Sequence, residues 1–168
     1  MKSQQLTVRA CSEADLEAVN DIYNHYVATS PATFDLEPLS IEQRREWFSH
    51  YATTGRYRAL VATDGERVVG WATSSPVRPR RAYETSIETT VYVEAEAAGR
   101  GVGSALYAAL FDAIAGEDIH RAYAGITQPN EASVALHERF GFHRVALYSE
   151  QGRKFGRYWD VAWFEKPL

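Results

Sequence analysis

A glycine-rich turn between a strand pattern and a helix pattern constrains the fold of this chain more than any other feature. Apolar residues alternate with polar ones along 85–94, as in a strand whose neighbouring side chains point to opposite faces. Gly99, Gly101 and Gly103 follow, and apolar residues at helical spacing begin at Leu106. The chain therefore passes from strand to helix within a few residues, through a backbone free to adopt positive φ and to approach a ligand closely.

The remaining patterns place this unit in an alternating order of elements. The expected strands are 6–10, 57–63, 67–74, 85–94, 121–126, 145–149 and 158–164. Four helices are expected, starting at Ser12, at Ser40, after Gly103 and at Asn130. The order predicts an α/β or α+β fold, a mixed sheet covered by helices, in a single domain of residues 1–168.

Composition narrows the class of protein. The net charge is -4 without a long basic run, which argues against a nucleic-acid partner. Cys11 is the single cysteine, so the chain cannot form an internal disulfide or a cysteine metal cluster. Met1 to Ala10 lacks the apolar stretch of a signal peptide, and no segment is apolar enough to span a membrane. We expect a cytoplasmic protein without a membrane partner.

The glycine turn has several interpretations. The first N–H groups of a helix lack internal partners and lie at the positive end of its dipole, which favours a phosphate. A P-loop requires lysine and then serine or threonine after its last glycine, whereas Ser104-Ala105 follows Gly103. A dinucleotide fingerprint requires a third glycine where Ser104 or Leu106 stands, and an acid ending the next strand, which Asp118 instead precedes. Glycines alone support a ligand site and a plain packing turn equally.

A resemblance supplies the interpretation that fits. Gly101 and Gly103 match the cofactor motif of the GNAT superfamily of N-acetyltransferases, in which glutamine or arginine stands three residues before the first glycine. Ala98 occupies that position here, and Arg100 is the nearby cation. The stretch 130–142 resembles a second, downstream motif of the same superfamily. Two motifs in the right order are more specific than either alone, and they imply acetyl-CoA as cosubstrate and no metal.

Nearly the whole chain is similar to one family in that superfamily, the phosphinothricin acetyltransferases, which include methionine sulfoximine and methionine sulfone acetyltransferases. The similar segments are 24–27, 33–35, 78–83, 88–93, 136–138 and 156–161. The resemblance implies acetyl transfer to the α-amino group of a small amino-acid-like compound of the phosphinothricin, methionine sulfoximine or methionine sulfone type. It also implies a mostly antiparallel sheet and a homodimer.

Glu88 is the predicted general base. An ammonium group must lose a proton before it attacks a thioester, and Glu88 lies mid-strand on the face opposite Ile87 and Val91. An isolated carboxylate in such a position can have a raised pKa and can act directly or through water. Composition alone favours an exposed glutamate on the wet face of a sheet, whereas the resemblance places the family's catalytic carboxylate here.

Substrate contacts are expected from a basic loop and from aromatic residues. Arg78, Arg80 and Arg81 cluster in an acidic protein, and arginine forks match carboxylate, phosphinate or sulfone oxygens. A solvated loop is the alternative, and we expect Arg78 to contact substrate first, Arg80 next, and Arg81 to lie on the surface. Phe34 and Tyr83 line the amine site or belong to the core. The predicted substrate-binding set is Phe34, Arg78, Arg80, Tyr83, Glu88 and Thr90.

The resemblance also assigns the cosubstrate contacts. Backbone N–H groups of Val91, Tyr92 and Val93 would stabilise the oxyanion and pair with the pantetheine arm. Asn130 either contacts that arm or caps its helix, and His137 stands where the superfamily places a tyrosine acid. For His137, general acid and packing residue are equally supported. The predicted set is completed by Gly99, Arg100, Gly101, Val102, Gly103, Ser104, Asn130 and Ser133.

Two other functions remain open at the level of sequence. A non-catalytic acyl-CoA-binding module is motivated by Ala98 and His137, where the superfamily pattern is broken. A protein or peptide N-acetyltransferase, acting on an N-terminus or a lysine, would need an open groove. A hydrolase is not supported, because no nucleophile motif with histidine and aspartate is present.

Overall fold

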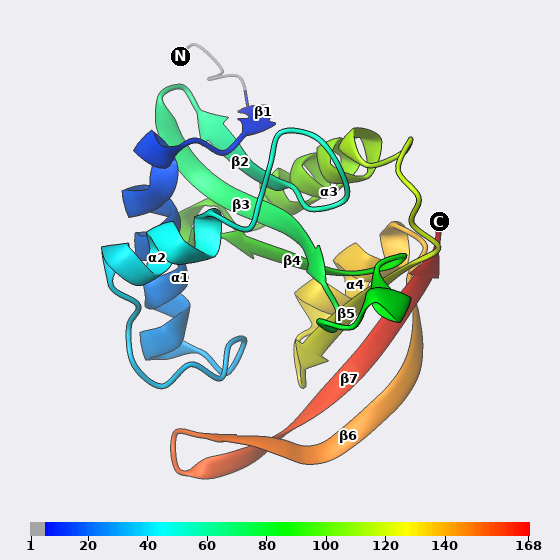
Figure 1. Ribbon diagram of the computed structural model, residues 1–168. Coiled ribbons are helices and arrows are strands. Elements are labelled where there is room, and N and C mark those ends of the chain that lie inside the picture. Colours follow the sequence, from blue (N-terminus) through cyan, green and yellow to red (C-terminus); the bar gives the residue numbers. More distant parts are fainter. Residues whose placement is uncertain (1–5) are drawn as a thin grey trace. The chain divides into compact units, whose positions relative to one another are not determined.

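The computed structural model describes residues 6–168 (Figure 1). The expectation that Met1 to Ala10 contains no signal peptide therefore concerns residues that partly lie outside the described part. The strands are β1 (Leu6–Ala10), β2 (Ala59–Asp64), β3 (Arg67–Pro76), β4 (Ser86–Val93), β5 (Arg121–Thr127), β6 (His143–Lys154) and β7 (Arg157–Pro167). The α-helices are α1 (Leu16–Thr29), α2 (Ile41–Phe48), α3 (Val102–Ala113) and α4 (Glu131–Arg139). Short 3-10 turns occupy Glu13–Asp15, Arg81–Tyr83 and Ala95–Ala97.

The strands follow the order β1-β2-β3-β4-β5-β7-β6. β4 and β5 run parallel, whereas the pairs β1–β2, β2–β3, β5–β7 and β6–β7 run antiparallel. The predicted fold class, a mixed and mostly antiparallel sheet with helices, is confirmed.

Contacts divide the chain into two compact units. The first comprises residues up to 23 together with 39–75 and 89–118, and the second comprises 24–38, 76–88 and 119–168. α1 and β4 each contribute residues to both units. The single domain of residues 1–168 stays a prediction.

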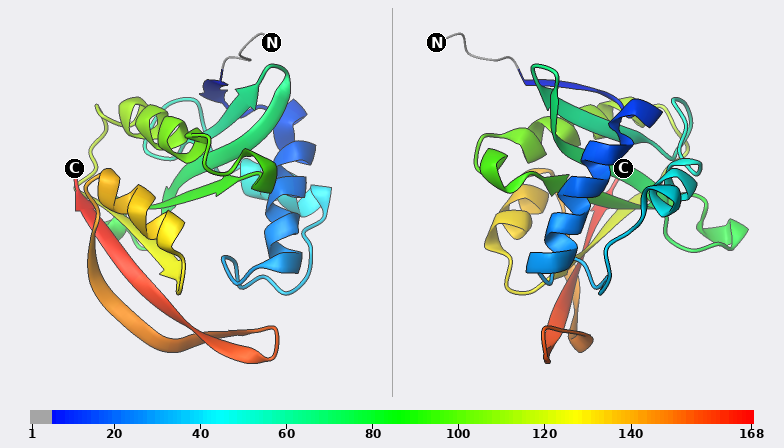
Figure 2. Two further views of the ribbon diagram at one scale, coloured as in Figure 1. Left: turned by 180° about the vertical axis from the view of Figure 1, so that it is seen from behind. Right: turned by 90° about the vertical axis from the view of Figure 1, so that its left-hand side faces the viewer.

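Helices cover both faces of the strands in the first unit. Consecutive residues of a strand point to opposite faces. A Cβ on Gly70 of β3 would lie 3.0 Å from Val102 and 3.2 Å from Leu106, both in α3. The next residue, Trp71, instead packs against Trp47 of α2, with ring centroids 5.4 Å apart. α3 therefore covers one face and α2 the other, as the two views of Figure 2 show.

Side-chain caps start the helices where the sequence predicts. Ser40 and Gln43 form a reciprocal capping box at α2. Ser12 and Asp15 form the predicted box one 3-10 turn before α1, and Asp15 also binds Arg9 of β1 through two hydrogen bonds of 2.7 Å. The Arg9 guanidinium lowers the pKa of Asp15 to about 2, so this carboxylate stays charged and ties β1 to the start of α1.

The second unit contains a two-sided sheet of β5, β7 and β6. Phe164 of β7 is buried and faces the ring of His137 from α4, with centroids 6.4 Å apart. The preceding residue, Trp163, lies over Gly125 of β5, where a Cβ would stand 3.0 Å from the indole. α4 therefore packs on one face, and Trp163 fills the space that Gly125 leaves on the other.

The last two strands are longer than predicted. The sequence pattern indicates 145–149 and 158–164, whereas β6 runs to Lys154 and β7 starts at Arg157. The pairing register shifts between Tyr148 and Gly152, and Glu150 has a positive φ of 53°. A bulge of this kind interrupts the alternation of apolar and polar residues that marks a strand in sequence. The sequence pattern therefore does not predict the full length of these two strands.

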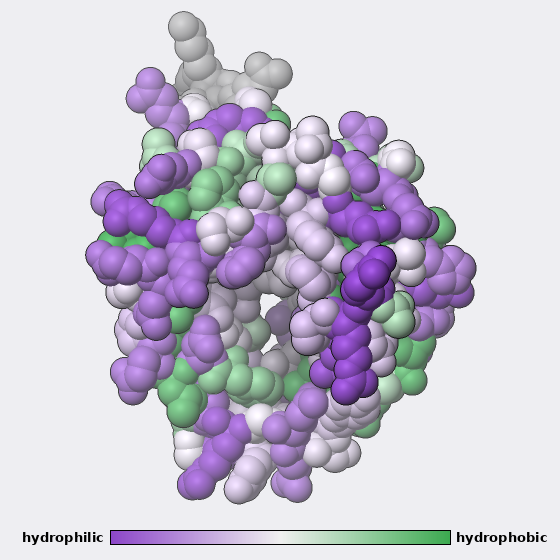
Figure 3. All heavy atoms as spheres, viewed as in Figure 1, coloured by the Kyte–Doolittle hydropathy of each residue, from purple (hydrophilic) through white to green (hydrophobic). Residues whose placement is uncertain are grey.

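The face drawn in Figure 3 mixes hydrophilic and hydrophobic side chains without one continuous apolar region. Among the described residues, no helix combines the length and the apolar character needed to cross a membrane. The cytoplasmic location stays a prediction.

Candidate active site

The turn before α3 has the backbone geometry expected of a phosphate site. Gly99 and Gly101 have φ values of 75° and 82°, in the left-handed region that favours glycine. Gly101 is the N-cap of α3 and provides no side-chain hydrogen bond to the helix end. Gly103 and Ser104 fall in the first helical turn. Gly99 and Gly101 therefore use the conformational freedom of glycine, whereas Gly103 is not among the glycines of positive φ.

Gly99 and Gly101 are also exposed, with open space around them. A Cβ built on Gly99 or Gly101 would meet nothing within 4 Å. The glycines are therefore required by the backbone conformation and not by crowding from the protein. An uncapped helix start with an accessible backbone fits the pyrophosphate of a nucleotide cosubstrate.

Arg100 is engaged by the protein itself. Its Nη2 donates to Oδ2 of Asp64, the last residue of β2, over 2.8 Å. The side chain of Arg100 is 53% exposed and that of Asp64 only 9%. The cation therefore lies at the turn, but it is held by a carboxylate.

The end of β4 is fixed beside α3 by a glycine that the sequence analysis missed. The Cβ position of Gly70 lies 3.0 Å from both the carbonyl oxygen of Tyr92 and a methyl group of Val102. A side chain here would be crowded by both neighbours, so Gly70 permits the close approach of the end of β4 to the first turn of α3 within the first unit. The ring of Tyr92 packs against Tyr23 and Trp71, with centroids 5.2 Å and 5.1 Å away. The side chain of Tyr92 therefore belongs to an aromatic cluster of the first unit.

Glu88 is a half-buried carboxyl group at the start of β4. It is level with Tyr123 of the parallel strand β5, and its neighbours Ile87 and Thr89 are buried on the opposite face. Burial raises the pKa of Glu88, and the positive charge of Arg78 opposes that rise. An exposed surface glutamate does not fit these facts, whereas a poised proton acceptor does.

The basic loop is exposed. Arg78 and Arg80 are exposed, and Arg81 has a side chain 95% exposed that lies 3.7 Å from Glu84. Tyr83 is 41% exposed, which excludes it from the core. The structure therefore brings Arg78 into electrostatic reach of Glu88 and places the other members of the loop at the surface.

Of the three residues predicted from the downstream motif, Asn130 is the N-cap of α4, and Ser133 and His137 lie within that helix. Oδ1 of Asn130 accepts a hydrogen bond of 3.1 Å from the N–H of Ser133. Nδ1 of His137 lies 2.7 Å from the carbonyl oxygen of Ser133, and since a carbonyl only accepts, Nδ1 donates. Burial lowers the pKa of His137, and the bond to the Ser133 backbone opposes that change. A lowered pKa disfavours the imidazolium that a general acid would need, so this geometry favours packing over proton donation.

Phe34 lies in the loop after α1 and contacts a residue that the sequence analysis did not consider. A Cβ on Gly152 of β6 would fall 2.3 Å from the tip of the Phe34 ring. Lys154, two residues further along β6, is 4% exposed and donates hydrogen bonds to the same loop. A glycine and a lysine in a polar strand carry no sequence signal for such a contact.

The predicted residues fall into the two units as follows. The first unit holds Thr90, Val91, Tyr92, Val93, Gly99, Arg100, Gly101, Val102, Gly103 and Ser104. The second holds Phe34, Arg78, Arg80, Tyr83, Glu88, Asn130, Ser133 and His137. Within residues 6–168, no group of three or more His, Cys, Asp or Glu side chains is arranged to hold a metal ion.

Within the first unit, a glycine turn at a helix start without a side-chain cap has the geometry of a site for a nucleotide-linked cosubstrate. The sequence matches the acetyltransferase (GNAT) family over residues 19–142. The chain belongs to this family.

Similar proteins support the same class. A phosphinothricin N-acetyltransferase of Streptomyces coelicolor is 60% identical over 98% of this chain and 97% of its own length. An L-methionine sulfoximine/L-methionine sulfone acetyltransferase of Pseudomonas paraeruginosa is 32% identical, over 96% of this chain and 94% of its own length. The crystal structure of a phosphinothricin acetyltransferase from Sinorhizobium meliloti, in complex with acetyl-CoA, has a TM-score of 0.91 and 33% identity, covering 97% of this chain and 88% of that one. The prediction of an N-acetyltransferase is confirmed.

Proposed function

We propose that this enzyme transfers the acetyl group of acetyl-CoA to the α-amino group of a small amino-acid-like compound of the phosphinothricin, methionine sulfoximine or methionine sulfone type. The observation that carries the proposal is Glu88, a half-buried carboxyl group of raised pKa within electrostatic reach of Arg78. The pair provides a proton acceptor for an ammonium group and a cation for an acidic or oxidised group on the same molecule.

Glu88 acts as the general base. An amino acid presents an ammonium group near neutral pH, and only the free amine attacks a carbonyl carbon. The Glu88 carboxylate accepts this proton, directly or through one water molecule. Its raised pKa brings the carboxyl closer to the working pH, where a base both stays ionised and binds the proton well.

Arg78 binds the acidic end of the substrate. Its guanidinium fork matches two oxygens of a carboxylate, a phosphinate or a sulfone. Arg80 and the aromatic rings of Phe34 and Tyr83 complete the amine site, with Thr90 on the same face of β4 as Glu88.

The glycine turn and the end of β4 bind acetyl-CoA. When bound, this molecule supplies an acyl thioester whose thiolate leaves readily. The N–H groups of residues 99–104 bind its pyrophosphate, and the backbone of Val91 to Val93 pairs with its pantetheine arm and donates to the developing oxyanion. Asn130 contacts the arm through its side-chain amide, while its Oδ1 also accepts from the N–H of Ser133. We assign His137 a packing role in α4.

Release of CoA tests the proposal. The purified protein is given acetyl-CoA with methionine sulfone, methionine sulfoximine or phosphinothricin, and free thiol is measured over time. We expect turnover with at least one of the three. Binding of acetyl-CoA without turnover of any small amine would favour a non-catalytic acyl-CoA-binding module. Acetylation of a test peptide but of no free amino acid would favour a protein N-acetyltransferase.

We also propose that the enzyme is a homodimer. The resemblance motivates this assembly, and β6 carries exposed apolar side chains for a second copy to cover: Val145, Leu147 and Tyr148 are 47%, 42% and 50% exposed. Light scattering on the purified chain tests it. We expect twice the chain mass, and the Leu147→Glu variant should shift the protein toward the monomer.

A further inference from the structure

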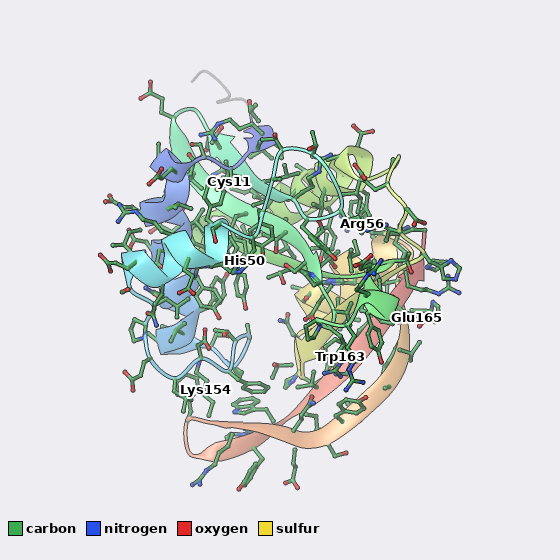
Figure 4. All side chains as sticks on the ribbon, viewed as in Figure 1. Cys11, His50, Arg56, Lys154, Trp163 and Glu165 are labelled. Carbon is green, nitrogen blue, oxygen red and sulfur yellow. The ribbon has the colours of Figure 1, made fainter. Side chains whose placement is uncertain are left out.

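The loop that follows α1 is fastened to β6 by a buried lysine. Nζ of Lys154 donates to the carbonyl oxygens of Ser30, over 2.9 Å, and of Thr33, over 2.8 Å. Burial lowers the pKa of Lys154, whereas the negative charge of Asp35 favours its protonated form. Burying an ammonium group is costly unless its hydrogens are bonded, and the two carbonyls accept from two of its three hydrogens. Figure 4 shows Lys154 where β6 approaches this loop, within the second unit.

The close packing of Phe34 against β6 also fixes the loop. The Phe34 ring lies against Gly152, and a Cβ there would fall 2.3 Å, 2.4 Å and 2.6 Å from three ring carbons. These separations are far shorter than carbon atoms tolerate, so the ring can occupy its position only over glycine. Opposite Gly152, Trp159 of β7 donates from Nε1 to the carbonyl of Lys154 over 3.0 Å. This hydrogen bond and the pairing with β7 fix the backbone of Gly152 and Lys154.

Residues 32–40 contain no helix or strand, so the position of Phe34 is not set by a regular element. It is set by the polar contacts at Ser30 and Thr33 on one side and by the glycine surface on the other. We propose that Gly152 and Lys154 are positioning residues that hold the Phe34 ring in the amine site, and so determine how tightly the enzyme binds its amine. This inference rests on the proposed function, in which Phe34 lines that site.

A purely structural role makes a different prediction from a positioning role. If β6 only stabilised the loop, changes at Gly152 would lower stability and leave the kinetic constants of the folded enzyme alone. If it positions Phe34, the same changes raise KM for the amine and leave KM for acetyl-CoA unchanged. The tip of a phenylalanine ring can move by rotation, so Gly152→Ala should displace the ring without unfolding the chain.

A double-mutant cycle isolates the contact. We expect Gly152→Ala to raise KM for the amine about tenfold, because a displaced contact residue weakens positioning. Phe34→Ala removes the ring, and in that background Gly152→Ala should add less than about twofold. Gly116→Ala is the matched control, since a Cβ there meets nothing within 4 Å. Equal effects of Gly152→Ala in both backgrounds would overturn the proposal.

The lysine is tested separately, with a readout that does not depend on turnover. Lys154→Met keeps the length of the side chain and removes its donors. We expect faster amide hydrogen exchange at residues 30–35 and a higher KM for the amine, with KM for acetyl-CoA unchanged. The control is Arg153→Met, at the exposed neighbouring position on β6. Unchanged exchange and unchanged KM in Lys154→Met would overturn the inference alone, whereas a wild-type enzyme that acetylates no amine would overturn the proposed function and this role with it.

Discussion

The glycine turn before α3 and the start of β4 are both assigned to substrates, but they are built from different parts of the chain. At the turn, Gly99 and Gly101 provide a left-handed backbone and an uncapped helix end, without side chains. At the start of β4, Glu88 provides a carboxyl group of raised pKa, and Arg78 provides a positive charge that opposes that rise. One region offers main-chain dipoles, and the other offers titratable and charged side chains.

The difference shows how each region tolerates substitution. A main-chain site depends on φ and on access, so changes of side-chain identity matter little as long as glycine geometry remains. The left-handed backbone at Gly99 and Gly101 is accordingly present with Ala98 in place of the superfamily's glutamine or arginine. A side-chain site depends on individual functional groups, and a change of one atom removes the chemistry.

The largest effect is expected at Glu88. Glu88→Gln keeps the shape and removes the proton acceptor, so kcat should fall about 10²–10⁴-fold, the usual contribution of a general base. Acetyl-CoA affinity should not change. Steady-state CoA release measures kcat, and calorimetric titration measures the affinity for acetyl-CoA. Glu84→Gln, at an exposed glutamate four residues earlier, is the control.

The pH profile of kcat/KM sharpens this assignment. Because the pKa of Glu88 is raised by burial, its base form is lost as pH falls through a value above that of an ordinary glutamate. Activity should therefore decline on the acid side at a higher pH than a free carboxyl would give, and the residual activity of Glu88→Gln should lack this limb. A variant that keeps more than about a tenth of wild-type kcat, with the same limb, would remove Glu88 from the mechanism.

Arg78 should give the next largest effect. Arg78→Met removes a charged donor but retains much of the side-chain length, and the loss of a charge-assisted hydrogen bond is worth about 1.5–3 kcal/mol, or about 10–150-fold in kcat/KM for the amine. The acid limb should also move to higher pH, because the cation that opposes the raised pKa of Glu88 is gone. Arg81→Met, at a side chain 95% exposed, is the control. An unchanged KM for the amine would assign Arg78 to the solvated surface.

At the turn, backbone geometry is the sensitive quantity. Gly101→Ala introduces a Cβ at φ 82°, which costs about 1–2 kcal/mol in the left-handed region although no atom lies within 4 Å of it. The strain is relieved by a change of φ that misaligns the N–H groups, so Kd for acetyl-CoA should rise about fivefold. KM for the amine should stay the same. Gly116→Ala, at an open glycine without positive φ, controls for the loss of glycine itself.

Sequence predicted the features of this molecule that depend on near neighbours. The capping boxes at Ser12 and Ser40 are set by contacts within a few residues, and the structure has both. Of the two roles left open for Asn130, the structure shows the helix cap. These signals lie in residue types at fixed spacing, which a pattern can express.

Features that depend on distant residues were missed. A side chain at Gly70 would be crowded by Tyr92 and Val102, which approach it from two other elements. Gly152 and Lys154 contact a loop that lies more than 100 residues earlier in the sequence. Both follow the bulge in β6 that interrupts the strand pattern. A glycine looks the same in sequence whether it faces solvent or a ring, so only the tertiary contacts distinguish these positions.

The smallest effect is expected at Arg100. A substitution there tests most directly whether main-chain groups or side chains supply the phosphate site at the turn. The pair of Arg100 with Asp64 is 53% exposed on the arginine side, and exposed pairs contribute about 0–1 kcal/mol. If main-chain groups supply the phosphate site, Arg100→Ala should raise Kd for acetyl-CoA by only about twofold, with a slightly weaker dependence on salt.

The matched control is Arg67→Ala. It removes an equally exposed arginine, which starts β3 and pairs with Glu94 at 2.8 Å. Asp64→Asn adds a second direction to the test, because it releases Arg100 from its carboxylate partner and should tighten acetyl-CoA binding slightly. A tenfold or greater loss in Arg100→Ala, with Arg67→Ala unchanged, would mean that a side chain supplies the cation missing at Ala98. The turn would then resemble the start of β4, a site built from charged side chains, and the contrast between the two regions would disappear.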